Sequence, residues 1–158
     1  MSVIVREIEE KDRKEIEEIV RKCFGKWDQY WALQGLNYTK VFVAELKNRP
    51  VGFAETYVTA VKGIGKVGVI YYLAVSPDYR RRGIAKSLIF RAEKYFRLRG
   101  ALLSTASTRH DNLASRRLFK SMGYKELIIW KKSLNLFAEK LTKALYAYED
   151  DIIFYKKL

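Results

Sequence analysis

The sequence predicts an α/β domain in which helices cover both faces of a central sheet. Segments with strand and helix patterns alternate in the order βααβββαβαβαβ, which interleaves helices with strands along the whole chain. Apolar runs such as residues 67–75 lack the polar alternation of a strand with one wet face. The 158 residues contain no linker or internal repeat, so we expect residues 1–158 to form a single domain.

The first elements are a strand and two helices. Residues 3–8 alternate as a strand does. Apolar side chains then recur on one face of a helix at Ile16, Ile19, Val20, Cys23 and Phe24. A shorter helix follows, with Leu36 and an aromatic stripe of Trp27, Tyr30 and Trp31. For at least two of these three aromatic side chains, packing in the core is the expected role.

Three strands follow at residues 40–46, 51–61 and 67–75, the first two joined by the turn signal Lys47-Asn48-Arg49-Pro50. The segment GIGKVG, residues 63–68, has the glycine spacing of a dinucleotide-binding loop. That loop lies between a strand and a helix, with an acidic residue about 20 positions later. Here the glycines lie between two strands and no such acid follows, so we expect a hairpin turn.

The rest of the chain alternates helices with strands. A helix begins at Gly83 and ends near Gly100, which is a natural C-cap, and residues 101–107 form the next strand. Asp111 and Asn112 are N-cap candidates for a helix that ends before Gly123. A strand at 124–131, an extra helix near 134–148 and a strand at 152–157 complete the chain. The side chains expected to face inward from the helix that begins at Gly83 are Ile84, Ala85, Leu88, Ile89, Ala92, Tyr95 and Phe96. The extra helix has one apolar face, formed by Leu134, Phe137, Ala138, Leu141, Leu145 and Tyr148.

The positive charge of the chain is concentrated in one third of its length. The net charge is +13, yet residues 1–60 hold 10 basic and 10 acidic side chains. Residues 80–132 hold 15 basic and 3 acidic side chains. Such a field attracts an anionic partner, which could be a nucleic acid, an anionic membrane or a phosphorylated cofactor. A solvated basic surface without a ligand is the alternative.

Other features limit the compartment and the chemistry. No apolar run approaches the roughly 18 residues of a membrane span, and the N-terminus lacks the apolar block of a signal peptide, so we expect no membrane association. Cys23 is the only cysteine, which excludes an internal disulfide and favours the cytoplasm. His110 is the only histidine and no Cys/His cluster surrounds it, so we expect no metal; a surface loop position is the expected one.

The segment RRRGIA, residues 80–85, has the layout of a phosphate-binding loop. It follows a buried strand and a Ser-Pro-Asp turn, and it leads into a helix. The first N–H groups of a helix have no internal partner and carry partial positive charge, which favours an anion. Gly83 lets a phosphate approach the backbone, while the neighbouring cations add charge-assisted hydrogen bonds. The P-loop pattern G-x-x-x-x-G-K-[ST] is absent.

This segment resembles the acyl-CoA motif of the GNAT-type N-acetyltransferases, [QR]-x-x-G-x-[GA], with Arg80, Gly83 and Ala85 at its fixed positions. Residues 112–126, NLASRRLFKSMGYKE, resemble the helix that follows in that family, and the element order matches over nearly the whole chain. The resemblance implies a mixed, mostly antiparallel sheet with splayed strands around an acyl-CoA cleft. It also implies transfer of an acetyl group from acetyl-CoA to the primary amine of a small molecule or protein.

The resemblance also assigns residues to the acyl donor. In that family the strand before the loop pairs with the pantetheine arm and the loop backbone holds the pyrophosphate. The assigned residues are Leu73, Ala74 and Val75 for pantetheine, Arg80, Arg81, Arg82, Gly83, Ile84, Ala85 and Lys86 for the pyrophosphate, and Asn112 with Ser115 nearby for the pantetheine arm. An N–H near Leu73 would polarise the thioester carbonyl. For Asn112 a simple N-cap role is also expected, and the two roles are compatible.

The sequence departs from the ribosomal-protein branch of that family. The Tyr acid and the Glu base of that branch correspond here to Phe119 and Ser107. Glu55 is the candidate base in their place, because it is the only charged side chain in residues 51–61; the alternative is a carboxylate that faces water or pairs with a lysine. Tyr72 is the candidate proton donor, with packing as its alternative. Trp27, Tyr30 and Trp31 are candidates for the acceptor pocket.

Two other functions stay open. One is a nucleic-acid-binding or ribosome-contacting basic domain, supported by Arg116, Arg117 and Lys120 but by no recognisable motif. The other is a CoA-binding regulator without catalysis. The expected partners are acetyl-CoA and an amine acceptor, for which the positive field favours a neutral or acidic molecule. The helix near 134–148 is a candidate for a homodimer interface or for one wall of the acceptor cleft.

Overall fold

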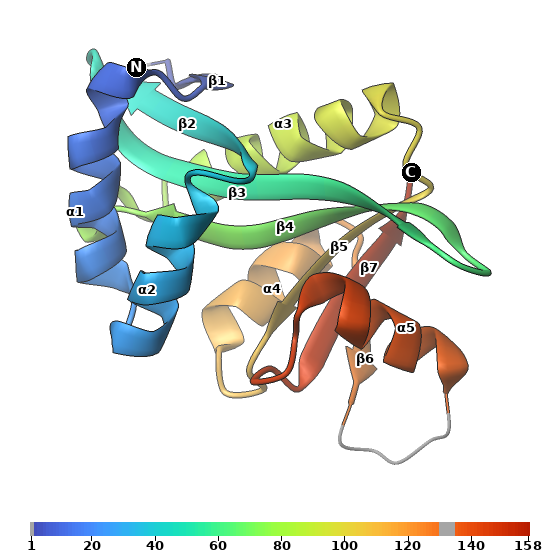
Figure 1. Cartoon of the computed structure of the whole chain (residues 1–158). Helices are drawn as coiled ribbons and strands as arrows, with labels where there is room; N and C mark the ends of the chain where they lie inside the picture. Colours follow the sequence, from blue (N-terminus) through green and yellow to red (C-terminus); the bar gives the residue numbers. More distant parts are fainter. Residues whose placement is uncertain (1, 130–134) are drawn as a thin grey trace. The chain divides into compact units, whose positions relative to one another are not determined.

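The structure is a computed structural model that describes residues 2–129 and 135–158 (Figure 1). Its elements follow the predicted order, βααβββαβαβαβ, with two additional 3-10 helical turns, η1 and η2. Their bounds are β1 (Ile4–Glu7), η1 (Glu10–Asp12), α1 (Arg13–Cys23), α2 (Lys26–Gly35), β2 (Lys40–Leu46), β3 (Arg49–Val61), β4 (Gly65–Val75), η2 (Pro77–Tyr79), α3 (Ile84–Leu98), β5 (Leu103–Thr108), α4 (Leu113–Ser121), β6 (Lys125–Ile128), α5 (Leu136–Leu145) and β7 (Ile152–Lys157).

In the described part of the chain, the strands form a seven-stranded sheet with the order β1-β2-β3-β4-β5-β7-β6. Strands β1, β2 and β3 pair antiparallel, as do β5, β7 and β6. Strand β4 pairs in parallel with β5 from Val67 to Ile70 and then continues to Val75. The mixed, mostly antiparallel sheet predicted from the resemblance is therefore confirmed.

The chain divides into two compact units. The first contains Met1–Tyr57 and Tyr72–Lys94, and the second contains Val58–Tyr71 and Tyr95–Leu158. Strands β3 and β4 and helix α3 each contribute residues to both units. We describe each unit by itself.

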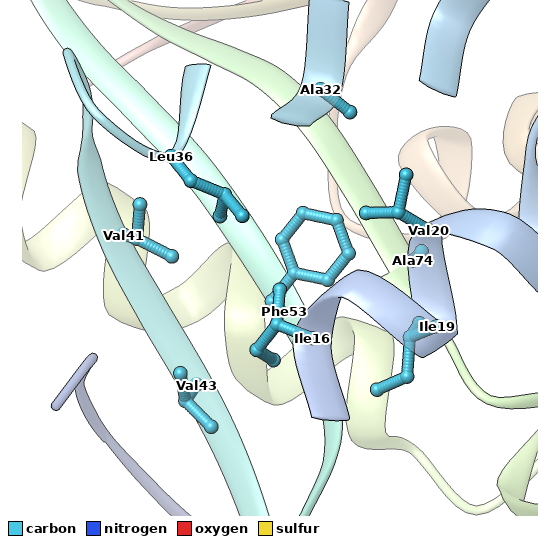
Figure 2. Close-up of a cluster of buried hydrophobic side chains, with 9 residues drawn as sticks. All are labelled: Ile16, Ile19, Val20, Ala32, Leu36, Val41, Val43, Phe53 and Ala74. Carbon is cyan, nitrogen blue, oxygen red and sulfur yellow. The ribbon is translucent and has the colours of Figure 1, made fainter. Parts of the chain in front are cut away.

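In the first unit, helices cover both faces of the sheet, and successive residues of β3 point to these two faces in turn. Phe53 lies opposite Val43, and its ring is at the centre of a buried cluster with side chains of α1 (Figure 2). The adjacent Gly52 faces the other way, where an added Cβ would meet the side chain of Leu88 on α3 at 3.3 Å. Residues that alternate along a strand point to opposite faces, so α1 and α2 cover one face and α3 covers the other. The residues of the cluster are Ile16, Ile19, Val20, Ala32, Leu36, Val41, Val43, Phe53 and Ala74.

In the second unit, α4 and α5 pack on opposite faces of β7. The ring of Phe119 on α4 stacks on Phe154, with centroids 4.5 Å apart. The ring of Phe137 on α5 meets the next residue of the strand, Tyr155, edge to face. Adjacent residues of a strand point to opposite faces, so this half of the sheet is also covered on both sides. Covered faces explain why the central strands carry few charges.

Three details differ from the sequence prediction. The hairpin between β2 and β3 is only two residues long, because Lys47 and Asn48 both adopt positive φ and Leu46 pairs directly with Arg49. Helix α5 ends at Leu145 and Tyr148 is exposed beyond it, so the predicted inclusion of Tyr148 in this helix is wrong. Strand β6 ends at Ile128. Residues 130 and 131 of its predicted continuation lie outside the described residues, and so does Leu134, which was predicted for the last helix.

Gly68 on β4 is expected to be intolerant of a side chain. A Cβ there would lie 2.2 Å from Cγ of Phe96, whose ring is fully buried, so Gly68→Ala must displace a packed ring. We expect a loss of about 1–3 kcal/mol in the free energy of unfolding, measured by urea denaturation. Gly25→Ala is the control, because an added Cβ meets nothing within 4 Å. Equal stability of Gly68→Ala and wild type would contradict the packing described here.

Candidate functional site

The end of β4 is held in place by side chains from two other segments of the first unit. The carbonyl oxygen of Val75 accepts hydrogen bonds from Nε of Arg80 at 3.0 Å and from the thiol of Cys23 at 3.6 Å. A guanidinium nitrogen of Arg80 also contacts Sγ of Cys23 at 3.4 Å. Arg80 therefore turns back onto the strand, and the Val75 carbonyl is already engaged. Leu73, Ala74 and Val75 remain predicted partners of pantetheine.

The loop from Arg80 to Gly83 turns sharply into α3. Arg81 and Gly83 both have positive φ, at 64° and 78°. Glycine adopts this conformation without strain, whereas a side chain at this φ costs free energy. An added Cβ at Gly83 would meet nothing within 4 Å. The glycine is therefore required by the backbone conformation, and the space in front of it is open to an incoming group.

The start of α3 presents unpartnered donors. Its first internal hydrogen bond runs from Ser87 N to the carbonyl of Gly83 at 3.1 Å. Among the described residues, the backbone N–H groups from Arg81 to Lys86 donate no hydrogen bond to other segments. These N–H groups carry the partial positive charge of the helix N-terminus. They are the donors that an anion would use.

The cations around this loop are not neutralised. Within the described residues, the side chains of Arg81, Arg82 and Lys86 form no ion pair and are exposed. Arg82 lies over the ring of Tyr79, 5.3 Å from its centroid, which orients the guanidinium without removing its charge. The loop thus combines free N–H groups with unpaired positive charge, and this combination fits a pyrophosphate.

Glu55 is fully buried and has no hydrogen-bond partner. Both of its carboxyl oxygens are unpartnered within the described part of the chain, and the side chain is 0% exposed. Glu55 pairs in register with Val41, so it shares the sheet face that α1 and α2 cover. Burial raises its pKa to about 9. The alternative in which this carboxylate faces water or pairs with a lysine is therefore wrong.

The hydroxyl of Tyr72 is engaged by an acidic side chain of α2. It donates a hydrogen bond to Oδ1 of Asp28 at 2.9 Å, and its ring meets Phe24 edge to face. Tyr72 also packs against the buried cluster of the first unit. Its packing role and its polar role therefore coexist, and its proton is directed at Asp28. The sequence interpretation overlooked Asp28, although it is the only acidic residue within the aromatic segment of α2.

Trp27, Tyr30 and Trp31 do not pack in the core. All three are exposed, with 61% of Trp27 accessible, so the expectation of core packing for at least two of them is wrong. The side of α2 that faces the sheet is instead formed by Ala32 and Leu36. The aromatic stripe lies on the opposite side of this helix because the two sets are offset by about half a turn. Exposure leaves the acceptor-pocket role of the stripe as a prediction.

Asn112 and Ser115 belong to the second unit. Oδ1 of Asn112 accepts a hydrogen bond from Ser115 N at 3.1 Å, which caps α4 and confirms the predicted N-cap. The Asn112 amide also donates to Thr108 at 3.1 Å. Their contact with pantetheine stays a prediction.

The polar groups near the end of β5 form further pairs. His110 lies in an exposed loop, as predicted, and its Nδ1 lies 2.6 Å from a carboxylate oxygen of Asp151. Arg116 forms a bidentate ion pair with Glu126 at 2.9 Å, and this pair holds the pKa of Glu126 below its usual range. One of the three cations proposed for nucleic-acid binding is thus neutralised.

The described residues contain neither a candidate metal site nor a candidate membrane span. No group of three or more His, Cys, Asp and Glu side chains there could hold a metal ion. None of the helices in residues 2–129 and 135–158 has the length and apolar character that crossing a lipid bilayer requires.

Comparison with known proteins gives a consistent assignment. The family model described as "Acetyltransferase (GNAT) family" matches residues 6–124. An uncharacterised N-acetyltransferase of Methanocaldococcus jannaschii is 28% identical over 118 residues, which are 73% of this chain and 52% of that protein. The chain thus spans about half the length of this curated relative.

Two solved structures share the fold. A chain of the NatC complex bound to Gag peptide and CoA has a TM-score of 0.76 at 20% identity, with 100% of this chain and 99% of that chain covered. The PaiA N-acetyltransferase from Thermoplasma acidophilum, in complex with coenzyme A, has a TM-score of 0.71 at 18% identity, with both chains covered fully (100%). Identities this low support the fold alone. The family model covers most of the chain, and the protein therefore belongs to the Acetyltransferase (GNAT) family.

Proposed function

We propose that this protein is an acetyl-CoA-dependent N-acetyltransferase that acetylates a primary amine of a small molecule or protein. The observation that carries the proposal is the loop from Arg80 to Lys86. There, N–H groups at the start of α3 and neighbouring cations coincide, and within residues 2–129 and 135–158 the N–H groups donate no hydrogen bond to other segments and the cations form no ion pair. Membership of the GNAT family and the CoA-bound structures of similar fold support the same donor.

The chain would hold the donor mainly through its backbone. The N–H groups from Arg81 to Lys86 would bind the pyrophosphate, while Arg82 and Lys86 add outer charge. Leu73 and Ala74 would pair with the pantetheine arm. Arg80 has a supporting role in this scheme, because its guanidinium fixes the Val75 carbonyl and hence the end of β4. Asn112 and Ser115 would bind the pantetheine arm.

We assign the general base to Glu55. The attacking amine must be neutral, so its proton needs an acceptor. A carboxylate with a pKa of about 9 is close in basicity to an alkylamine, and close matching of pKa values favours proton transfer in both directions. Because Glu55 is fully buried, the proton would reach it through intervening water.

Tyr72 is the proposed proton donor to the leaving thiolate, a role in which its O–H would turn from Asp28 toward the sulfur. The reaction depends only modestly on a proton donor, because a free thiol titrates near ~8.5 and the thiolate is a stable leaving group. The hydrogen bond to Asp28 holds the phenol in place at the end of β4, immediately before Leu73. The exposed stripe of Trp27, Tyr30 and Trp31 would border the acceptor.

Nucleic-acid binding and catalytically silent CoA binding are the two competing functions. The unpaired cations of the loop would also suit a nucleic-acid phosphate, but Arg116 is occupied by Glu126. In this proposal the 158 residues act as one domain in the cytoplasm, and a homodimer through α5 stays a prediction.

Acetyl-CoA is expected to raise the melting temperature. A ligand at 100 times its dissociation constant stabilises the folded state by about 2.7 kcal/mol, which corresponds to roughly 5–10 °C for a chain of this length. Scanning fluorimetry with acetyl-CoA, with acetate as the control, measures the shift. No shift at saturating acetyl-CoA would refute the proposal.

DNA binding that weakens steeply with salt would favour the nucleic-acid function. Thiol release with at least one amine in a screen would exclude the silent regulator.

A further inference from the structure

The N-terminal half of α2 carries an exposed aromatic–acidic patch, formed by Trp27, Asp28, Tyr30 and Trp31. All four side chains are exposed on this helix in the first unit. Large exposed aromatic side chains are costly in water, and grouped ones mark a binding surface. Binding of acetyl-CoA does not explain the patch, because the strand and the loop proposed to hold acetyl-CoA are the end of β4 and the start of α3.

The three rings of the patch are arranged edge to face. The rings of Trp27 and Trp31 have centroids 6.0 Å apart with an interplanar angle of 65°, and Tyr30 meets Trp31 at 5.1 Å and 73°. Edge-to-face packing leaves part of the ring faces uncovered. The face of an aromatic ring carries negative charge density, and tryptophan attracts a cation most strongly.

The carboxylate of Asp28 adds a full negative charge to the patch. It accepts a hydrogen bond from Tyr72, and within the described residues it forms no ion pair. By contrast, the carboxylates of Asp12 and Glu126 are each held by an arginine, although the chain has 31 basic and 18 acidic residues. An exposed carboxylate beside three exposed rings is complementary to an organic cation.

The patch is also close to the proposed donor strand. Tyr72, which hydrogen-bonds to Asp28, is the residue before Leu73 on β4. A single side chain therefore connects the patch to the backbone that would hold the acyl donor. Residues 1–60, which contain the patch, have no net charge, whereas the positive surplus lies in residues 80–132. The overall charge of +13 thus does not prevent local binding of a cation.

We propose that the aromatic–acidic patch binds an alkylammonium group of the acceptor, so that the preferred acceptors are small diamines. One nitrogen, protonated, would lie on the patch against Asp28 and the tryptophan rings. The other nitrogen, neutral, would attack the thioester carbonyl and lose a proton to the ionised form of Glu55. The C–S bond breaks in this step, and the leaving CoA thiolate takes a proton from Tyr72. This inference rests on the proposed function, and it replaces the expectation of a neutral or acidic acceptor that the net charge alone suggested.

A binding experiment isolates the patch from catalysis. Choline and 3,3-dimethylbutan-1-ol have nearly the same shape, but only choline is charged. We expect choline to bind at least roughly fivefold more tightly, as measured by NMR shifts of the indole N–H groups. Asp28→Asn keeps an oxygen for Tyr72 and removes the charge, and Trp27→Leu removes a ring; each should reduce the preference to less than about twofold. Glu18→Gln is the matched control, because Glu18 is an exposed carboxylate on α1 that forms no ion pair in the described part of the chain.

An activity experiment tests the role in acceptor choice. With acetyl-CoA as donor, kcat/KM for 1,4-diaminobutane should exceed that for butylamine by roughly tenfold, and Asp28→Asn should bring the ratio close to one.

Thiol release that does not distinguish the two amines would overturn this inference and leave the acetyltransferase function intact. Equal binding of choline and its neutral analogue would also overturn it. A choline preference that survives both Asp28→Asn and Trp27→Leu would place the cation elsewhere, which contradicts the proposal as well. If no amine causes thiol release, the proposed acetyltransferase function is refuted, and the proposed role of the patch in binding the acceptor is refuted with it.

Discussion

Glu55→Gln is expected to stabilise the protein and to abolish most of its activity. The side chain is fully buried, its oxygens have no partner among the described residues, and its pKa is raised to about 9. A neutral glutamine fits the same position without an ionisation cost. A functional group that lowers stability is a common feature of catalytic sites.

The stability change follows from proton linkage. In the unfolded chain Glu55 ionises near its ordinary value of 4.5, whereas in the folded chain it keeps its proton up to about pH 9. Between these values the folded state binds the extra proton, so stability falls as the pH rises, by about 1.4 kcal/mol per unit. At neutral pH the accumulated loss in the free energy of unfolding is about 3 kcal/mol. Glu55→Gln removes this loss, so the melting temperature should rise by roughly 5–10 °C.

The comparison with wild type at several pH values checks this reasoning. The gain from Glu55→Gln should be smallest near pH 5, should increase up to about pH 9, and should then stay constant. Glu18→Gln, on the exposed surface of α1, should show no such trend. A gain that does not depend on pH would mean that the Glu55 carboxyl is not held in its protonated form.

The rate of acetyl transfer should change in the opposite direction. Loss of a general base costs roughly 100- to 10,000-fold, and for wild type kcat/KM should rise with pH until the base ionises near pH 9. An acceptor amine with a low pKa separates this rise from titration of the acceptor itself. If Glu55→Gln retains the wild-type rate at about pH 9, Glu55 is not the base.

Arg82→Glu is expected to weaken acetyl-CoA binding by roughly 10- to 100-fold. The substitution replaces an unpaired cation of the loop with an anion that repels a pyrophosphate, and hydrogen bonds to charged groups contribute about 1.5–3 kcal/mol each. Isothermal titration calorimetry measures the affinity. The binding should also weaken with salt, because the loop is exposed.

The control for Arg82→Glu is Lys94→Glu. Lys94 is exposed further along α3 and the same change of charge is made away from the loop, so its effect on acetyl-CoA should be less than about threefold. Both variants should unfold at nearly the same temperature as wild type, since exposed charges contribute little to stability. Equal acetyl-CoA affinity in the two variants would mean that the loop does not bind phosphate.

Local sequence patterns were sufficient for the elements and for the loop that leads into α3. Turn residues, apolar periodicity and the pattern around Gly83 depend on neighbours in the chain, so they predicted the order of the elements and the place where α3 begins. The N-cap at Asn112 is local in the same sense, because it joins residues three positions apart. For these features the physical cause is contained in a few consecutive residues.

The tertiary structure decided the environment of α2 and of the side chains proposed to act on the acceptor. Periodicity groups Trp27, Tyr30 and Trp31 on one side of α2, but it does not say whether that side meets the sheet or the solvent. The hydrogen bond between Tyr72 and Asp28 joins residues 44 positions apart, and the burial of Glu55 depends on α1 and α2 covering β3. Burial, partners and pKa are set by segments distant in sequence, so the chemistry assigned to these residues became visible only in the folded chain.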